Sequence, residues 1–334
     1  MCEAPEWNTR KCKRDLFLAR LASTGKNPYK RYTRSPLRYA GGKSLAVGII
    51  IESIPDNIET VVSPFMGGGS VEIALARELD IPVIAYDIFT ILCRYWQVHI
   101  DKPERLADTL MQWQPTQDTY KEVKDRLKSH WQGECKIEDK TLLAAHYWYN
   151  HNLSYGPGFL GWMSKIYECP DRYKRLVDKV RHFDAKNLRV RQGSFEKSLP
   201  RHKGDFLYCD PPYYLQGNSK MFRGIYPQRN FPIYHDGFDH QALRDILLDH
   251  EGGFLMSYND CDVIREWYSS CDIRRVEWRY TMGQGETRIG KNRIDNGTYD
   301  NVKDSHEILI SKKPKKPNSP EKGMSSEQAS LVAH

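Results

Sequence analysis

The stretch "DFLYCDPPYYL" holds the residues best suited to chemistry. An apolar run ends there in Asp210-Pro211-Pro212-Tyr213. Two prolines fix the backbone and remove two amide donors, so the local carbonyls act only as acceptors beside the carboxylate. An exocyclic NH2 can donate to these acceptors while its ring stacks on the tyrosine. Holding both amine hydrogens favours a pyramidal nitrogen whose lone pair can attack a methyl sulfonium. The alternative interpretation is a plain turn that closes a strand.

A second signal is the glycine cluster "PFMGGGS". Phe65, Gly67 and Gly69 lie where an apolar run gives way to a helical pattern, and glycine lets the backbone approach a ligand closely. Asp87 ends the next apolar run, where a carboxylate can accept hydrogen bonds from ribose hydroxyls. This pairing indicates a nucleoside cofactor and leaves NAD and S-adenosylmethionine open, although the glycines alone are also typical of a tight turn. The amine-holding segment favours S-adenosylmethionine.

The stretch "LRYAGGKS" looks like the end of a phosphate-binding loop. That loop needs a glycine five positions before its Gly-Lys-Ser. Leu37 stands at that position, five residues before Gly42. Without the first glycine the backbone amides cannot wrap a triphosphate in the usual way, so we do not predict an NTPase.

The elements that position these residues follow from the apolar periodicity. Residues 44–54 predict a helix, followed by a strand that ends at the glycines, a helix, and a strand that ends at Asp87. This βαβ order predicts a parallel, doubly wound α/β sheet. From about 91 to 190 the pattern is polar-rich and helical, which predicts an insert. Apolar runs of strand character resume in "DFLYCD", "GGFLMSYND" and "SHEILIS", with helical patterns between them.

The composition is that of a globular protein, with 334 residues, 40% hydrophobic and 28% charged. No apolar run approaches the ~20 residues of a membrane span, and the N-terminus lacks the apolar region of a secretory signal. We therefore expect no membrane partner and a cytoplasmic, intracellular location. A net charge of +7 favours a polyanionic partner. The eight cysteines are scattered, and His146 and His151 are five residues apart, so we predict no disulfide framework and no metal site.

Several segments in order resemble a Dam-type DNA adenine-N6 methyltransferase of the α group: "SPLRYAGGKS", "VVSPFMGGGSVEIA", "AYDI", "VRQGSFEKSLP", "DFLYCDPPYYL", "FLMSYND" and "HEILIS". The resemblance implies a Rossmann-like methyltransferase sheet with helices on both faces, plus a mainly helical target-recognition insert. The expected divisions are a basic N-terminal arm (1–33), an S-adenosylmethionine-dependent catalytic domain (34–100 and 188–312), a helical DNA target-recognition insert (101–187) and a disordered tail (313–334).

The resemblance also assigns site residues. It implies that S-adenosylmethionine is bound by Tyr39, Gly42, Lys43, Phe65, Gly67, Gly69, Asp87 and Asp210. It implies a catalytic segment made of Asp210, Pro211, Pro212 and Tyr213. Lys43 is expected to pair with the methionine carboxylate, and Tyr39 to pack on the cofactor. Two positions depart from the family: Ser63 replaces an acid expected near the methionine amino group, and Ser194 replaces an Asp expected near the cofactor's adenine.

Double-stranded DNA is the partner that the resemblance implies. A stacked target base has to be flipped out of the duplex before it can reach Tyr213. Two glycine-containing stretches, 149–165 and 279–294, supply the expected DNA-binding residues: Asn152, Tyr155, Lys165, Arg288 and Lys291. The first stretch occupies the place of the family's DNA-contacting hairpin, and the alternative is a loop that packs on its own domain.

The leading hypothesis is therefore site-specific methyl transfer to adenine N6 in double-stranded DNA. An Asp-Pro-Pro-Tyr segment suits any exocyclic amine, so cytosine N4 in DNA and an amine in RNA are alternative targets. A non-catalytic DNA-binding protein on a methyltransferase fold is an alternative of another class. Ser63 and Ser194 keep it open, whereas the intact segment at Asp210 argues against it. The sequence does not distinguish a role beside a cognate restriction endonuclease from a solitary regulatory role.

Overall fold

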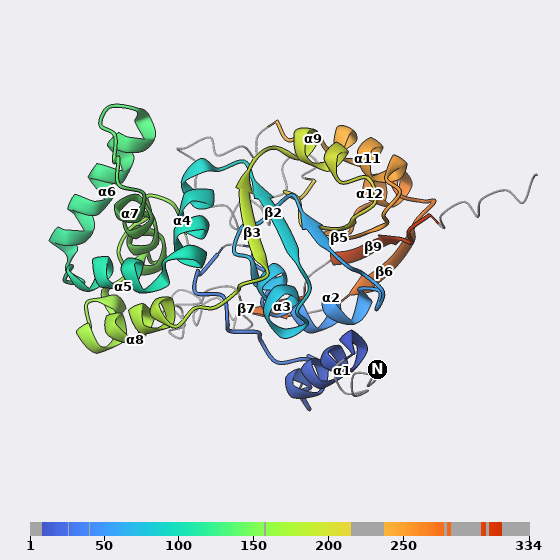
Figure 1. Cartoon of the computed structure of the whole chain (residues 1–334), viewed down its shortest axis with the longest axis horizontal. Helices are drawn as coiled ribbons and strands as arrows, with labels where there is room; N and C mark the ends of the chain where they lie inside the picture. Colours follow the sequence, from blue (N-terminus) through green and yellow to red (C-terminus); the bar gives the residue numbers. More distant parts are fainter. Residues whose placement is uncertain are drawn as a thin grey trace, which may run out of the picture.

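One mixed sheet organises the molecule. The computed structural model describes residues 9–25, 27–39, 41–156, 158–214, 237–276, 279–281, 302–304 and 307–315. Within them, seven strands pair in the order β3-β2-β1-β4-β5-β9-β6 (Figure 1). Their bounds are β1 Val61–Ser63, β2 Val83–Asp87, β3 Leu188–Gln192, β4 Phe206–Cys209, β5 Phe254–Asn259, β6 Asp272–Val276 and β9 Glu307–Lys312. A separate short pairing joins β7 (Arg279–Thr281) to β8 (Val302–Asp304).

The strands from β3 to β5 are parallel, and β9 runs against both of its neighbours. The predicted α/β sheet with helices on both faces is confirmed, whereas the reversal of β9 was not predicted. An apolar run such as "SHEILIS" indicates a strand but carries no information about its direction. The reversal has a consequence for the site, because it places Glu307, the first residue of β9, opposite Asn259, the last residue of β5.

Helices cover both faces of the sheet (Figure 1). One face carries α1 (Arg10–Leu21), α2 (Val47–Ser53), α3 (Ser70–Glu78) and α4 (Thr90–Asp101). The other face carries α9 (Phe195–Ser198), the 3-10 turn η3 (Leu199–Arg201), α11 (His240–Asp249) and α12 (Asp262–Trp267). Alternation along the strands produces the two cores, because successive side chains point to opposite faces. The first core lies between the sheet and the face with α1 to α4, and the second lies under α9, α11 and α12. In β4, Phe206 and Tyr208 join the first core, and Leu207 and Cys209 join the second.

The insert between β2 and β3 is helical. It contains α5 (Pro103–Met111), α6 (Gln117–Gln132), α7 (Lys140–Leu153), η2 (Lys165–Tyr167) and α8 (Pro170–Arg181). Helix α7 packs on α4, and Asp139 caps its start by accepting from the amides of Thr141 and Leu142. Because α7 is buried along nearly its whole length, the core of the insert is continuous with the core beneath the sheet.

The N-terminal basic stretch is partly built into the fold. Helix α1 buries Phe17 edge-on against Tyr32, with ring centroids 5.7 Å apart. Lys13 and Arg14 of the same helix pair with Asp80 and Asp56. Among the helices that the structure describes, none is long and apolar enough to cross a bilayer. Most of the predicted disordered tail lies outside the described residues.

Candidate active site

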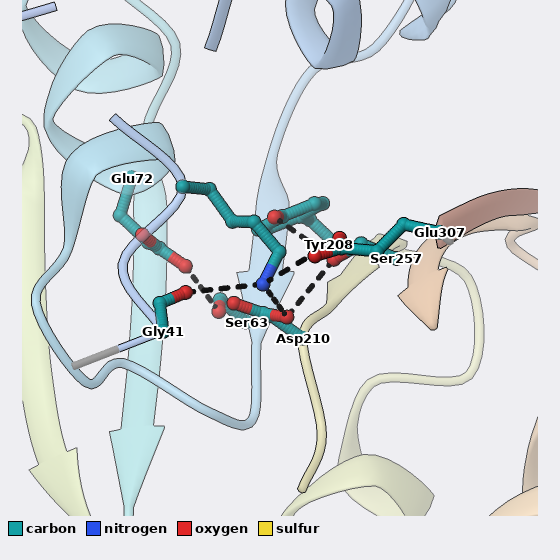
Figure 2. Close-up of polar contacts among 8 residues, drawn as sticks. Gly41, Ser63, Glu72, Tyr208, Asp210, Ser257 and Glu307 are labelled. Carbon is teal, nitrogen blue, oxygen red and sulfur yellow. Dashed lines mark hydrogen bonds and ion pairs between the residues drawn. The ribbon is translucent and has the colours of Figure 1, made fainter. Parts of the chain in front are cut away.

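Polar side chains converge at the carboxyl edge of the central strands. Ser63 ends β1, Asp87 ends β2, and Asp210 directly follows β4. Parallel strands end at one edge of the sheet, and ligands of such sheets bind where the strand order reverses, here between β1 and β4. The reversed β9 adds Glu307 to the same edge. Figure 2 shows Ser63, Asp210 and Glu307 grouped there.

Asp210 is held by two donors. Its Oδ1 accepts from Lys43 Nζ at 2.8 Å and from Ser257 Oγ at 3.0 Å. Ser257 is fully buried in β5, so the carboxylate is fixed by two different elements. Charge-assisted bonds of this kind are the stronger ones. Since both bonds fall on Oδ1, the carboxylate is oriented with Oδ2 as its other acceptor.

Lys43 is nearly buried, with 4% of its side chain exposed. Its ammonium lies 2.8 Å from Asp210, 4.0 Å from Glu307 Oε2 and 3.1 Å from the carbonyl oxygen of Gly41. The sequence predicted a partnership between Lys43 and a ligand carboxylate. In the structure Lys43 pairs with Asp210, the first residue of the Asp-Pro-Pro-Tyr segment, and its pairing with the cofactor's carboxylate stays a prediction.

The tyrosines after Asp210 are fixed by β5. Tyr213 is buried, with the ammonium of Lys43 5.0 Å from its ring centroid and the ring of Tyr258 stacked at 6.3 Å. The side-chain amide of Asn259 accepts from the backbone N–H of Tyr214 and donates to its carbonyl oxygen. This two-way bond fixes the backbone just after Pro211 and Pro212. Asn259 was not predicted from the sequence; its signal is a polar residue that ends an apolar strand.

The glycine turn joins β1 to α3. Gly67 and Gly69 have φ angles of +43° and +65°, values that favour glycine over other residues. Tyr39 lies against this turn, since a Cβ added at Gly68 would meet the Cβ of Tyr39 at 2.5 Å. The opposite side of Tyr39 stacks on His151, with centroids 5.6 Å apart. Burial lowers the pKa of His151 to about 3, so this imidazole is neutral.

Gly42 and Phe65 complete the predicted set around the turn. Gly42 donates its N–H to the carbonyl oxygen of Tyr39, which closes the bend that aims Lys43 at Asp210. The ring of Phe65 packs against Phe195 and Phe238, with centroids 6.0 and 5.7 Å away. Phe65 therefore belongs to the second core and borders the turn from that side.

Asp87 is tied to the same turn. Its Oδ2 accepts from the N–H of Gly67 at 3.0 Å and its Oδ1 from the N–H of Phe89 at 2.9 Å. Burial raises the pKa of Asp87, and these amide bonds oppose the rise. A cleft of about 400 Å³ opens next to Asp87; its walls are Tyr86, Ile88, Gln192, Gly193, Ser194, Lys197, Ser198 and Arg201. An acid beside a cleft with one exposed aliphatic wall, Ile88, fits a ribose that carries a planar base.

A buried acid that was not predicted from the sequence lies just after the glycine turn. Glu72, in the first turn of α3, accepts from Ser63 Oγ at 2.7 Å, and its side chain is 3% exposed (Figure 2). Burial raises the pKa of Glu72 to about 7. The available signal was an acid inside an otherwise apolar helical stretch, "SVEIALA", nine residues after the serine that replaces the expected acid.

The expected DNA-binding residues of the insert fall in two environments. Asn152 is buried; its amide accepts from the N–H of Arg38 at 2.8 Å and donates to the carbonyl oxygen of Pro36 at 3.0 Å. The guanidinium of Arg38 returns bonds to the carbonyl oxygens of Asn152 and Ser154. Asn152 therefore joins α7 to the segment before Lys43, and we do not carry it into a DNA interface.

Tyr155 and Lys165 are exposed. The chain folds back between them, because Ser154 and Met163 form an antiparallel bridge and the N–H of Tyr155 donates to the carbonyl oxygen of Trp162. Trp162 is 81% exposed, and Lys124 Nζ of α6 lies 4.1 Å from its ring centroid. Trp162 was not predicted from the sequence, although it is an aromatic residue beside glycine in a polar loop.

Arg288 and Lys291 lie outside the described residues. In the part of the chain that is described, no three His, Cys, Asp or Glu side chains gather as a metal site would require.

The sheet order, the glycine turn after β1 and the acid-proline-proline-tyrosine segment after β4 together define a methyltransferase of the α/β class. A family model described as D12 class N6 adenine-specific DNA methyltransferase matches residues 39–282. The chain belongs to this family, and its activity is site-specific methylation of adenine in DNA. The cytosine, RNA and non-catalytic alternatives are thereby set aside.

The chain is similar to several curated proteins. A type II methyltransferase, M1.LlaDCHI of Lactococcus lactis subsp. cremoris, is 24% identical over 270 residues, which are 76% of this chain and 91% of that protein. Type II methyltransferase M.FokI of Planomicrobium okeanokoites is 23% identical over 80% of this chain, and modification methylase StsI of Streptococcus sanguinis is 22% identical over 84%. The chain spans 43% of each of the last two proteins.

Proposed function

We propose that this enzyme takes the methyl group from S-adenosylmethionine and places it on N6 of an adenine flipped out of duplex DNA. The observation that carries the proposal is the position of Asp210, oriented by Lys43 and Ser257 at the same sheet edge as the glycine turn and Asp87. The proposed amine acceptor and the proposed nucleoside site would thus lie side by side. When bound, the cofactor supplies an electrophilic methyl group on a sulfonium.

The residues of the chain would hold the adenine amine, support the flipped base and keep the segment after β4 rigid. Asp210 Oδ2 and the carbonyl oxygen of Pro211 would accept the two hydrogens of the adenine amine, while Lys43 keeps the carboxylate oriented through Oδ1. The ring of Tyr213 would support the flipped base. Stacking there requires the ammonium of Lys43 to shift off the ring while it stays beside the carboxylate. Asn259 would keep the segment rigid during the transfer.

We propose that duplex DNA contacts the fold-back that the bridge between Ser154 and Met163 closes. Trp162 offers an exposed ring, and Lys124, Lys165 and Tyr155 lie around it on the same insert. Lysines contact phosphates, and an aromatic ring can stack on an unpaired base. This surface therefore suits a duplex from which a base has been flipped out.

A direct test uses cofactor labelled in the methyl group and a mixed-sequence duplex, with methylated positions read by single-molecule sequencing. Label should appear as N6-methyladenine in one short sequence, and the Asp210→Ala variant should lose the transfer while it retains most of its DNA affinity. Label in a duplex that lacks adenine, or near-normal turnover by the variant, contradicts the proposal. Trp162→Ala should weaken DNA binding and leave cofactor binding unchanged, with Met111→Ala, another exposed apolar residue of the insert, as the control.

We propose a cognate restriction endonuclease as the biological partner, since two of the similar proteins are named type II methyltransferases. DNA methylated by this enzyme should then resist an endonuclease that cuts the sequence found above. Full cleavage of fully methylated DNA by that nuclease would favour the solitary regulatory role.

A further inference from the structure

The buried pair of Ser63 and Glu72 is not explained by packing alone. Both side chains are almost fully buried, at 0% and 3% exposed, and their oxygens are 2.7 Å apart. A buried carboxylate is costly unless it is paired or hydrogen-bonded. An apolar side chain would fill this part of α3 without that cost, as Ile73, Ala74 and Leu75 do next to it.

Opposing features set the charge of Glu72. Glu72 lies in the first turn of α3, where the helix dipole stabilises an anion. Burial, the largest effect, favours the neutral form and so does the charge of Asp210, while the hydroxyl of Ser63 and the nearby ammonium of Lys43 favour the ionised form. The environment therefore supports a carboxylate that is easily ionised when another cation arrives.

The charges around the glycine turn do not balance. Lys43 is the one ammonium among the described side chains of this cluster, and three carboxyl groups lie near it: Glu72, Asp210 and Glu307. Figure 2 shows Glu72 on one side of Ser63 and Asp210, and Glu307 on the other. Because Lys43 is closest to Asp210 and also near Glu307, Glu72 is the acid left to face an incoming positive group.

We infer that Glu72, oriented by Ser63, binds the α-ammonium of the cofactor's methionine group, and that this acid on α3 replaces the one that position 63 lacks. The inference rests on the proposed use of S-adenosylmethionine. Glu72 is then a cofactor-binding residue beyond the set that the sequence predicted. Ser63 is a positioning residue that acts through the carboxylate.

Two ligands isolate the contact. S-adenosylhomocysteine carries the ammonium without the sulfonium, and 5′-methylthioadenosine carries neither the ammonium nor the carboxylate. By calorimetry, Glu72→Gln should weaken S-adenosylhomocysteine binding roughly tenfold or more, the amount expected for a lost charged hydrogen bond. Its affinity for 5′-methylthioadenosine should not change. Glu78→Gln is the matched control, because Glu78 is on the same helix and accepts from the hydroxyl of Tyr32, away from the site.

A double variant distinguishes a loss of ligand binding from a loss of folding. Ser63→Asp combined with Glu72→Gln returns a carboxylate to the end of β1 and should recover most of the lost affinity for S-adenosylhomocysteine. Equal binding of this ligand by wild type and Glu72→Gln would overturn the inference, and so would an equal loss for both ligands. If wild-type protein binds neither ligand, the proposed cofactor is wrong, and that outcome is distinct from failure of the inference.

The pH dependence gives an independent check. Affinity of the wild type for S-adenosylhomocysteine should rise between pH 6 and 8 as Glu72 ionises, with release of a proton on binding, and Glu72→Gln should lack both effects. The other groups that face Glu72 are Lys43, Asp210, Tyr208 and Cys209. Burial raises the pKa values of Tyr208 and Cys209 well away from this range. The same pH dependence in the variant would overturn the inference.

Discussion

At the residue scale, Lys43 supplies the positive charge that compensates the neighbouring acids of the site. It lies between Asp210 and Glu307, and both Lys43 and Glu307 are almost fully buried. Removing one partner from a buried ion pair leaves an uncompensated charge, which costs more than the pair contributes. A surface pair of the same length contributes little, because water and salt screen it.

We therefore expect Lys43→Met to lower the free energy of unfolding by about 3 kcal/mol and to abolish methyl transfer. Urea unfolding at pH 7 and the labelled-methyl assay measure the two effects. The control is Lys13→Met, which breaks the exposed 2.7 Å pair with Asp80 and should cost less than about 1 kcal/mol. Equal losses in the two variants would mean that Lys43 has no special role.

Glu72 provides a prediction for stability and pH. Its pKa is about 7 in the folded chain and 4.5 in an ordinary setting. The folded protein therefore keeps this proton to a higher pH than the unfolded chain does. Wild-type stability should therefore fall as pH rises from about 4.5 to 7, by up to about 3 kcal/mol from this group. The stability of Glu72→Gln relative to wild type should therefore be higher at pH 8 than at pH 5. Urea unfolding at both values tests this, and a pH-independent difference contradicts it.

Part of the site could be predicted from the sequence and part could not. Asp210, Gly67 and Asp87 lie at the ends of apolar runs, so local pattern predicts where they occur. Glu307 reaches the site only because β9 is reversed, and Glu72 only because the first turn of α3 faces the end of β1. Both facts depend on tertiary geometry. Asn152 was expected to face DNA and is buried, because the last turn of α7 packs on the segment at 36–38.

At the element scale, the glycine turn and the segment before α2 form one unit. Tyr39 fills the space above Gly68 and is backed by His151 of α7. The turn therefore has the correct shape only when the segment and the insert are both in place. The sequence predicted the strands, the glycine turn and the helical insert, but it contains no local signal for this three-way contact.

Gly68→Ala should consequently disturb the cofactor site. The new methyl group would meet Tyr39 Cβ at 2.5 Å, and such overpacking costs about 1–3 kcal/mol. We expect weaker binding of S-adenosylhomocysteine with a smaller change in thermal stability. Gly204→Ala serves as the control, because a Cβ there meets nothing within 4 Å. Unchanged ligand affinity in Gly68→Ala would show that Tyr39 is free to move.

At the scale of the whole molecule, the chain carries a net charge of +7. DNA binding that neutralises phosphates releases counterions, so affinity should fall linearly on a plot of log affinity against log salt. We expect a slope steeper than about −3, which corresponds to three or more phosphate contacts. Fluorescence anisotropy with a labelled duplex between 50 and 200 mM salt, roughly the informative range, measures it. A flat plot would mean that the basic excess is incidental to binding.

The position of β9 also affects how the protein is made. β6 joins the main sheet through β9 alone, and β9 is the last of the sheet's strands to leave the ribosome. Until then β5 has an unpaired edge, a feature that invites aggregation and proteolysis. A translation product that stops before Glu307 lacks this closing strand and one acid of the site. Truncated copies should therefore be removed by cellular quality control before they can modify the genome.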